Sequence, residues 1–137
     1  MSVVEESASG FSIRVSASLV FVRHWGVMTC TLGHAFAEQY KTAINPLIGQ
    51  SWAEVVDLTE VLEVEPGRWA EVATLFEFEN LQNNVATAYV ISERTAPDHL
   101  RDLRYLIATQ TASFADQFFL DPIEALNWVN QRLASSR

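Results

Sequence analysis

Cysteine is almost absent from this sequence. Cys30 is the only one among 137 residues, which excludes an internal disulfide framework and a four-cysteine zinc module. Histidine is also scarce, and His24, His34 and His99 are scattered without the spacing typical of metal ligands. Basic residues number 9 against 17 acidic ones, and the resulting net charge of −8 argues against a nucleic acid as partner.

Several functional sequence signals are missing as well. The sequence holds no apolar run of about 18 residues, so we expect no transmembrane segment. The first residues lack the basic and apolar regions of a secretory signal, which predicts a cytoplasmic protein. Glycine-rich phosphate-binding loops and the Gly-x-Ser-x-Gly nucleophile motif are absent too. We therefore expect no enzymatic activity and no cofactor.

Length and hydropathy predict one folded domain. A chain of 137 residues with 49% hydrophobic side chains falls within the usual size of a single domain and has enough apolar residues for a core. Residues 1–10 contain three serines and one glycine, and we expect them to form a flexible lead-in. The domain is then expected to span residues 11–137.

The hydrophobic pattern predicts strands that alternate with helices. Phe11, Ile13 and Val15 alternate with polar residues, which is typical of a half-buried strand that pairs in a hairpin with residues 19–25. The later segments predict strands over 52–58, 86–91 and within 112–120, and helices over 31–45, from Pro66, from Asp98 and from Pro122, which follows Asp121 as N-cap. The order β-β-α-β-α-β-α-β-α indicates an α/β fold with packed helices, a mostly parallel sheet and an antiparallel edge hairpin.

Three local segments, together with this order, carry a resemblance to a known family. They are Trp25-Gly26-Val27-Met28-Thr29, Val55-Val56-Asp57-Leu58-Thr59-Glu60-Val61, and Phe118-Phe119-Leu120-Asp121-Pro122-Ile123-Glu124-Ala125-Leu126-Asn127-Trp128-Val129. Over roughly residues 11 to 135, the chain resembles the SpoIIAA-like family of the STAS superfamily, which is named for sulfate transporters and anti-sigma-factor antagonists. The resemblance implies the SpoIIAA-like fold and a regulatory, non-enzymatic role.

The resemblance does not extend to the regulatory serine of that superfamily. In classical members, a kinase phosphorylates a serine at the start of the helix that follows the central strand. That position falls near Pro66 here, and Thr59 is the nearest hydroxyl. The resemblance therefore implies the scaffold and the use of this loop as a contact surface, without the kinase switch.

An acidic tract is the most distinctive charge feature. Between Glu54 and Glu79 the sequence has eight acidic residues and one basic residue, Arg68. Concentrated charge of one sign steers association with an oppositely charged protein. We predict a partner-binding surface on loop 59–67 and the following helix, made of Thr59, Glu60, Glu63, Glu65, Pro66, Gly67 and Arg68. The alternatives are a merely solvated face and a hard cation held by glutamates, but the spacing matches no calcium loop, so no metal is predicted.

Bulky aromatic residues suggest an alternative function. Five of them are candidates for an apolar pocket or an exposed interface: Phe36, Tyr40, Trp69, Phe76 and Phe78. The simplest interpretation places them in the core. As an alternative, they form a site for a small apolar ligand or lipid between helices and sheet, or a homodimer contact. Proteins of the resembled fold are also similar in outline to lipid-transfer domains.

Cys30 is the last candidate. His34 lies four residues later, so one helical turn would bring a cation beside the thiol, as a reactive thiolate requires. A buried and inert cysteine is the commoner alternative.

Overall fold

The computed structural model describes residues 2–6, 8–81, 83–109 and 115–136 of the chain. Six strands form one sheet in chain order: β1 (Ser2–Glu6), β2 (Ser9–Ser16), β3 (Leu19–Met28), β4 (Trp52–Val64), β5 (Asn84–Val90) and β6 (Ala115–Phe119). The described helices are α1 (Cys30–Ile44), the 3₁₀ helix η1 (Asn45–Leu47), α2 (Arg68–Leu81), α3 (Pro97–Thr109) and α4 (Pro122–Ser135). None of these helices is long and apolar enough to cross a membrane.

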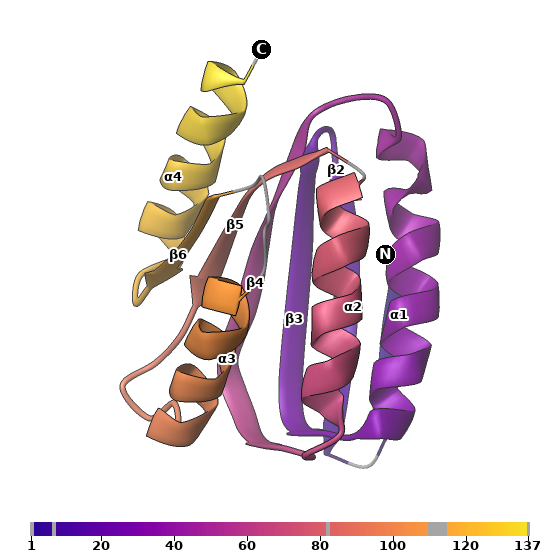
Figure 1. Cartoon of the computed structure of the whole chain (residues 1–137), viewed down its shortest axis with the longest axis vertical. Helices are drawn as coiled ribbons and strands as arrows, with labels where there is room; N and C mark the ends of the chain where they lie inside the picture. The colour runs from indigo at the N-terminus through magenta and orange to yellow at the C-terminus, as the bar shows by residue number, and fades with distance from the viewer. Residues whose placement is uncertain (1, 7, 82, 110–114, 137) are drawn as a thin grey trace.

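The sheet is mixed, with antiparallel strands at one edge. β1, β2 and β3 pair in antiparallel fashion, and β3, β4, β5 and β6 pair in parallel. Because the parallel strands advance in one direction across the sheet, right-handed crossovers place α1, α2 and α3 on the same face. Figure 1 shows α1 and α2 side by side in front of the antiparallel part of the sheet. The predicted fold class is confirmed.

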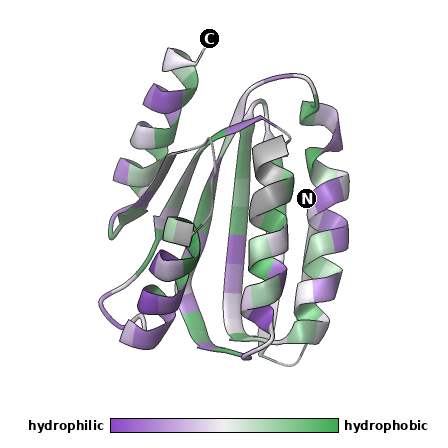
Figure 2. Ribbon diagram, in the orientation of Figure 1, coloured by the Kyte–Doolittle hydropathy of each residue, from purple (hydrophilic) through white to green (hydrophobic). Residues whose placement is uncertain are grey.

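The two faces of the sheet bury different residues. Under α4, the buried sheet residues are mostly alanine and valine, and they pack against Ala125 and Val129. The opposite face buries larger residues, among them Phe36, Tyr40 and Trp52. Figure 2 shows the hydrophobic residues along the central strands and a mixture of hydrophilic and hydrophobic residues on the helices. The alternating pattern of the strands therefore feeds two separate cores.

The lead-in predicted for residues 1–10 is wrong, since Ser2–Glu6 form β1 and Ser9 begins β2. Val4 of β1 lies opposite Phe11 of β2 in antiparallel register. Without β1, the long strand β2 would expose a row of unpaired backbone groups at the sheet edge. Pairing satisfies these groups, and the serines that suggested a loose segment do not oppose it.

The predicted acidic loop 59–67 is also largely wrong, because β4 continues to Val64. β3 is ten residues long and pairs with β4 as far as Met28 opposite Val64. Two register shifts interrupt this pairing, between Arg23 and Trp25 and between Gly26 and Val27. Such bulges disturb the alternation of apolar and polar side chains, so the sequence resembles a loop. Consequently α2 begins at Arg68 and not at Pro66, which lies in the preceding turn.

The start of α4 agrees with the prediction in detail. Asp121 is the N-cap and accepts a hydrogen bond from the backbone N–H of Ile123 at 2.8 Å, and Pro122 is the first helical residue. The cap accepts a hydrogen bond from one of the free backbone donors at the helix start, and the proline has no N–H that would need a partner there.

Candidate functional site

A cavity of about 90 Å³ lies between α2, α3 and the sheet. β5 ends at Val90, opposite Asp57, whereas β4 continues to Val64. Thr95, His99 and Leu100, from α3 and the segment before it, line the cavity beside this unaccompanied part of β4. Its wall is otherwise mostly apolar and comes from the sheet, α2 and α3, with Val22, Met28, Val56, Leu58, Val61, Val64, Val72, Leu75 and Leu103. The part of β4 that extends beyond β5 therefore contributes to the hollow on this face.

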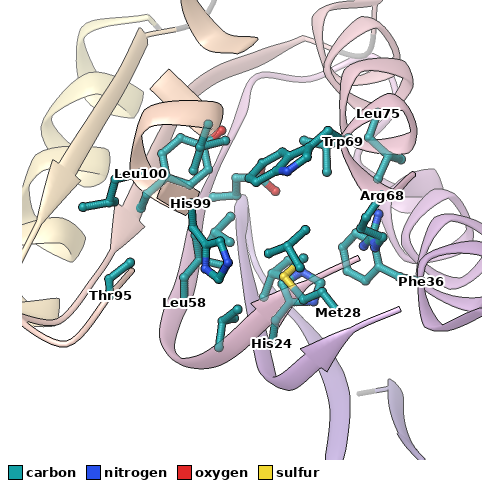
Figure 3. A pocket seen from close by; sticks show the side chains of 18 of the residues that line it. His24, Met28, Phe36, Leu58, Arg68, Trp69, Leu75, Thr95, His99 and Leu100 are labelled. Atoms are coloured by element: carbon teal, nitrogen blue, oxygen red, sulfur yellow. The ribbon is translucent and has the colours of Figure 1, made fainter. Parts of the chain in front are cut away.

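Arg68 is the fully buried cation of this site. It is the first residue of α2, it lines the cavity, and only 2% of its surface is exposed. In the part of the chain that the structure describes, Nε and Nη1 of its guanidinium have no hydrogen-bond partner. Figure 3 shows Arg68 beside Phe36 on one side of the cavity, with His99 and Leu100 across from them. A buried unpaired donor of this kind normally costs about 1–3 kcal/mol, more when charged.

Gly33 makes room for the Arg68 side chain. A Cβ at Gly33 would lie 2.6 Å from Arg68 Nε and 2.8 Å from its Cζ. The guanidinium therefore rests directly on the backbone of α1, and α1 and α2 approach each other closely at this point. A larger residue at either position would push the helices or the side chain out of place.

The charge of Arg68 is poorly compensated. Burial lowers the pKa of Arg68, and the carboxylate of Glu71, one turn further along α2, acts in the opposite direction. Glu71 Oε2 lies 3.2 Å from His34 Nδ1, which makes an ion pair when His34 is protonated, and both Glu71 oxygens lack a hydrogen-bond partner among the described residues. No described carboxylate forms an ion pair with Arg68 within 4.0 Å. Arginine stays protonated in proteins, so the cavity wall carries a positive charge at neutral pH.

His24 stands beside this charge as a neutral imidazole. Burial, and then the nearby Arg68, lower the pKa of His24 to about 3. Its ring packs against Phe36, with 4.7 Å between the ring centroids. His24 is therefore uncharged at pH 7 and contributes a polar surface to the wall without a second cation.

A hydrogen-bond network closes another part of the wall. Buried Glu54 accepts hydrogen bonds from the Tyr40 hydroxyl at 2.6 Å and from the Thr87 hydroxyl at 3.1 Å. Asn84 in turn donates to the Thr87 hydroxyl at 2.8 Å. Both carboxylate oxygens of Glu54 thus accept a hydrogen bond from the protein. In contrast, Nε and Nη1 of Arg68 find no acceptor among the described residues.

Three of the five predicted apolar-site residues meet at this cavity. Phe36 and Tyr40, about one turn apart on α1, and Trp69 of α2 line it. Phe78 packs against the core near Tyr40, with 6.3 Å between ring centroids, and does not line the cavity. The side chain of Phe76 lies outside the described residues.

The predicted partner-binding residues divide between surface and interior. Glu60, Leu62, Glu63, Glu65, Pro66 and Gly67 are exposed and form what we call the β4–α2 surface. Thr59 is half-buried, and its hydroxyl donates to Asp57 Oδ1 at 2.6 Å. Arg68 points into the cavity, so its assignment to the partner surface is wrong. Its long apolar stem and the space above Gly33 allow it to turn inward.

Two glutamates of the β4–α2 surface already have partners within the chain. Glu60 forms an ion pair with Arg23 of β3. Glu65 accepts a hydrogen bond from the backbone N–H of Cys30, 3.2 Å away, at the start of α1. Leu62, between them in sequence, exposes 76% of its surface. Within the described ranges, no three His, Cys, Asp or Glu side chains gather to hold a metal ion.

Cys30 has the opposite electrostatic environment from a reactive thiolate. The carboxylate of Glu65 accepts a hydrogen bond from the thiol and, together with burial, raises the pKa of Cys30. His34 pairs with Glu71 and is not among the groups that shift this pKa. The proposed Cys30–His34 pair therefore does not form.

The comparisons with known proteins concern the fold. No protein-family model and no curated protein matches the chain. An uncharacterized protein of the DUF3478 family from Shewanella loihica PV-4, solved as a SpoIIAA-like fold, matches with a TM-score of 0.70 and 15% identity, over 92% of this chain and 98% of that one. This chain has the SpoIIAA-like fold.

An anti-sigma factor antagonist from Mycobacterium paratuberculosis shares this SpoIIAA-like fold at greater distance. Its TM-score is 0.55 and its identity 16%, over 92% of this chain and 97% of that one. At such identities the likeness shows the fold alone. It confirms the architecture that the three sequence segments and the element order predicted.

Within this SpoIIAA-like fold, Arg68 is the cavity residue whose buried position was not predicted from the sequence. One signal for it was present: Arg68 is the lone basic residue of the acidic tract and stands in the first turn of a helix. A cation there opposes the helix dipole, so its presence calls for a specific reason. His24, Glu54 and His99 gave no such signal, because only the folding of the chain brings them to the same cavity.

Proposed function

We propose that this chain is a non-enzymatic, cytoplasmic regulatory module that binds a basic protein partner through the β4–α2 surface. The observation that carries this proposal is the exposed Leu62, placed between the carboxylates of Glu60, Glu63 and Glu65. An exposed apolar side chain with acidic neighbours in the sequence combines an anchor with electrostatic steering. The likeness to an anti-sigma factor antagonist, a protein named for a regulatory role, supports this choice.

The proposal is tested by crosslinking in the source cell. A photoreactive phenylalanine analogue at position 62 is expected to capture a defined protein, whereas the same analogue at Tyr105, which is 71% exposed on α3, is not. The two positions are matched in exposure but lie on different surfaces. Equal products from both positions, or none from position 62, contradict the proposal.

Charge reversal tests the steering. Glu63→Lys is expected to reduce capture severalfold at low salt, because exposed like charges govern association rates. Glu38→Lys, an equal change on the exposed side of α1, serves as the control and is expected to leave capture unchanged. Equal effects of the two variants contradict a role for the β4–α2 surface.

The cavity favours a second candidate function, the binding of a small apolar molecule. Its volume of about 90 Å³ and its predominantly apolar wall are the supporting observations. Native mass spectrometry of gently purified protein is expected to show an added mass that disappears on denaturation. A uniformly ligand-free mass, and no binding of small hydrocarbons or alcohols in solution, contradict this function.

A further inference from the structure

We propose that the cavity binds a short-chain organic carboxylate, with the carboxylate on the Arg68 guanidinium and the hydrocarbon chain among the apolar side chains between α2 and α3. This inference rests on the second candidate function above and assigns the chemical class of its ligand. The geometry that carries it is a guanidinium, with two donors that lack acceptors in the described chain, at the wall of a mostly apolar cavity.

Arg68 has hydrogen-bond donors that the described chain leaves without acceptors. Its side chain is 98% buried, and Nε and Nη1 lack protein acceptors among the described residues. Nε–H and the Nη1 amino group lie on different edges of the planar guanidinium, and each can donate a charge-assisted hydrogen bond to an oxygen of a carboxylate. Position adds to this match, since Arg68 begins α2 and the backbone N–H groups of a helix start also favour an anion.

The groups around the Arg68 guanidinium leave it available to a ligand. Gly33 lies directly against the guanidinium, so α1 offers no side chain at that contact. His24 is neutral, and both oxygens of Glu54 accept hydrogen bonds from Tyr40 and Thr87. Glu71 does not line the cavity; its Oε2 lies 3.2 Å from His34 Nδ1, and neither of its carboxylate oxygens has a hydrogen-bond partner among the described residues. Among the charged residues that line the cavity, Arg68 is the one with buried donors that lack acceptors in the described chain.

The volume of the cavity limits the length of the ligand. A cavity of about 90 Å³ is smaller than the engineered cavity of about 150 Å³ that binds benzene. It therefore fits a chain of a few carbon atoms and not a long fatty acid. Inorganic phosphate would find the same guanidinium, but its remaining charged oxygens would face apolar side chains at a high desolvation cost.

The test is a calorimetric and NMR titration of the full chain with acetate, butanoate, pentanoate and octanoate. Affinity is expected to rise about fourfold for each added methylene and then to stop rising once the cavity is full. Pentanol, which has the apolar chain without the charge, is expected to bind roughly 10- to 100-fold more weakly than pentanoate. Inorganic phosphate is expected not to bind at this site.

Arg68→Met separates the anion site from the apolar cavity. It is expected to lose the preference for pentanoate over pentanol, while its affinity for pentanol stays at the wild-type level. Arg101→Met, on the exposed side of α3, is the matched control and is expected to keep the preference. Backbone resonances of the unliganded variant report whether it folds, and if Arg68→Met does not fold, Arg68→Lys keeps the charge and is expected to bind pentanoate with reduced affinity.

Each result is decisive for one of the two proposals. Equal binding of pentanol and pentanoate by the wild type overturns the carboxylate assignment but leaves an apolar-ligand function standing. Phosphate binding as tight as that of pentanoate also overturns the assignment. Binding of neither pentanol nor pentanoate overturns both the inference and the function on which it rests.

Discussion

On the α4 face, the sheet buries small residues such as Ala86 and Ala88 under Ala125 and Val129, whereas the α1–α3 face buries aromatic rings together with Arg68, His24 and Glu54. The first arrangement brings a helix close to the strands and forms an apolar core. The second buries polar groups, which lowers the stability of the fold, and these groups line a cavity. Since buried unpaired charge weakens a fold, its restriction to one face separates the part that stabilises the domain from the part available for binding.

Acid should expose the weakness of the α1–α3 face most strongly. The pKa of His24 is about 3 in the folded protein and about 6.5 in the unfolded chain, so the unfolded state binds the proton first as pH falls. The stability associated with neutral His24 is therefore present above pH 6.5 and is lost progressively toward pH 3. Between pH 7 and pH 4 the loss is about 3 kcal/mol.

Urea unfolding at both pH values measures this effect. His24→Leu is expected to lose about 3 kcal/mol less than the wild type over the same interval, because it removes the titrating group. Identical pH dependence of variant and wild type would contradict a buried neutral histidine. His99→Leu, at a half-buried position of the same cavity, is the control.

A matched pair of enlargements sharpens the comparison of packing. Ala125→Leu, at a fully buried position of α4, is expected to reduce the free energy of unfolding by about 2 kcal/mol, since a dense core has no room for added atoms. Val72→Leu, whose side chain lines the cavity, is expected to be neutral or slightly stabilising. Equal destabilisation by the two variants, measured in urea, would show that the faces are packed alike.

The smallest effect concerns the contact between Gly33 and Arg68. Gly33→Ala should cost about 1 kcal/mol, because overpacking against the guanidinium outweighs the gain in helix propensity. In an Arg68→Ala background the collision disappears, and the same change should stabilise the protein by about 1 kcal/mol. A double-mutant cycle in urea checks the reversal of sign, and additive effects would contradict the contact.

The sequence predicts this fold where local chemistry is sufficient. Asp121 and Pro122 specify the start of α4, and the alternation from Phe11 specifies β2, because both depend on neighbours in the chain. The end of β4 could not be predicted in this way. Its bulges arise from the pairing with β3, which lies far away in the sequence. Without knowledge of that partner strand, the glutamates of this segment predict a loop.

The candidate site was predictable only in part. An apolar site that includes Phe36, Tyr40 and Trp69 was predicted only as the alternative to a core position, and these three residues line the cavity. Arg68 was assigned to the partner surface because it directly follows the predicted loop 59–67. Its actual position depends on Gly33, a residue 35 positions earlier, through a contact that no local pattern encodes.

That contact also makes positions 33 and 68 an evolutionary marker. An arginine at position 68 fits over α1 only where position 33 carries no side chain, so drift at one site constrains the other. Among chains of this architecture, those that keep both residues should form a subgroup with a charged hollow. A bulkier residue at position 33 should accompany a shorter one at position 68. In such chains we expect the cavity to be lined by apolar side chains alone or to be filled by them.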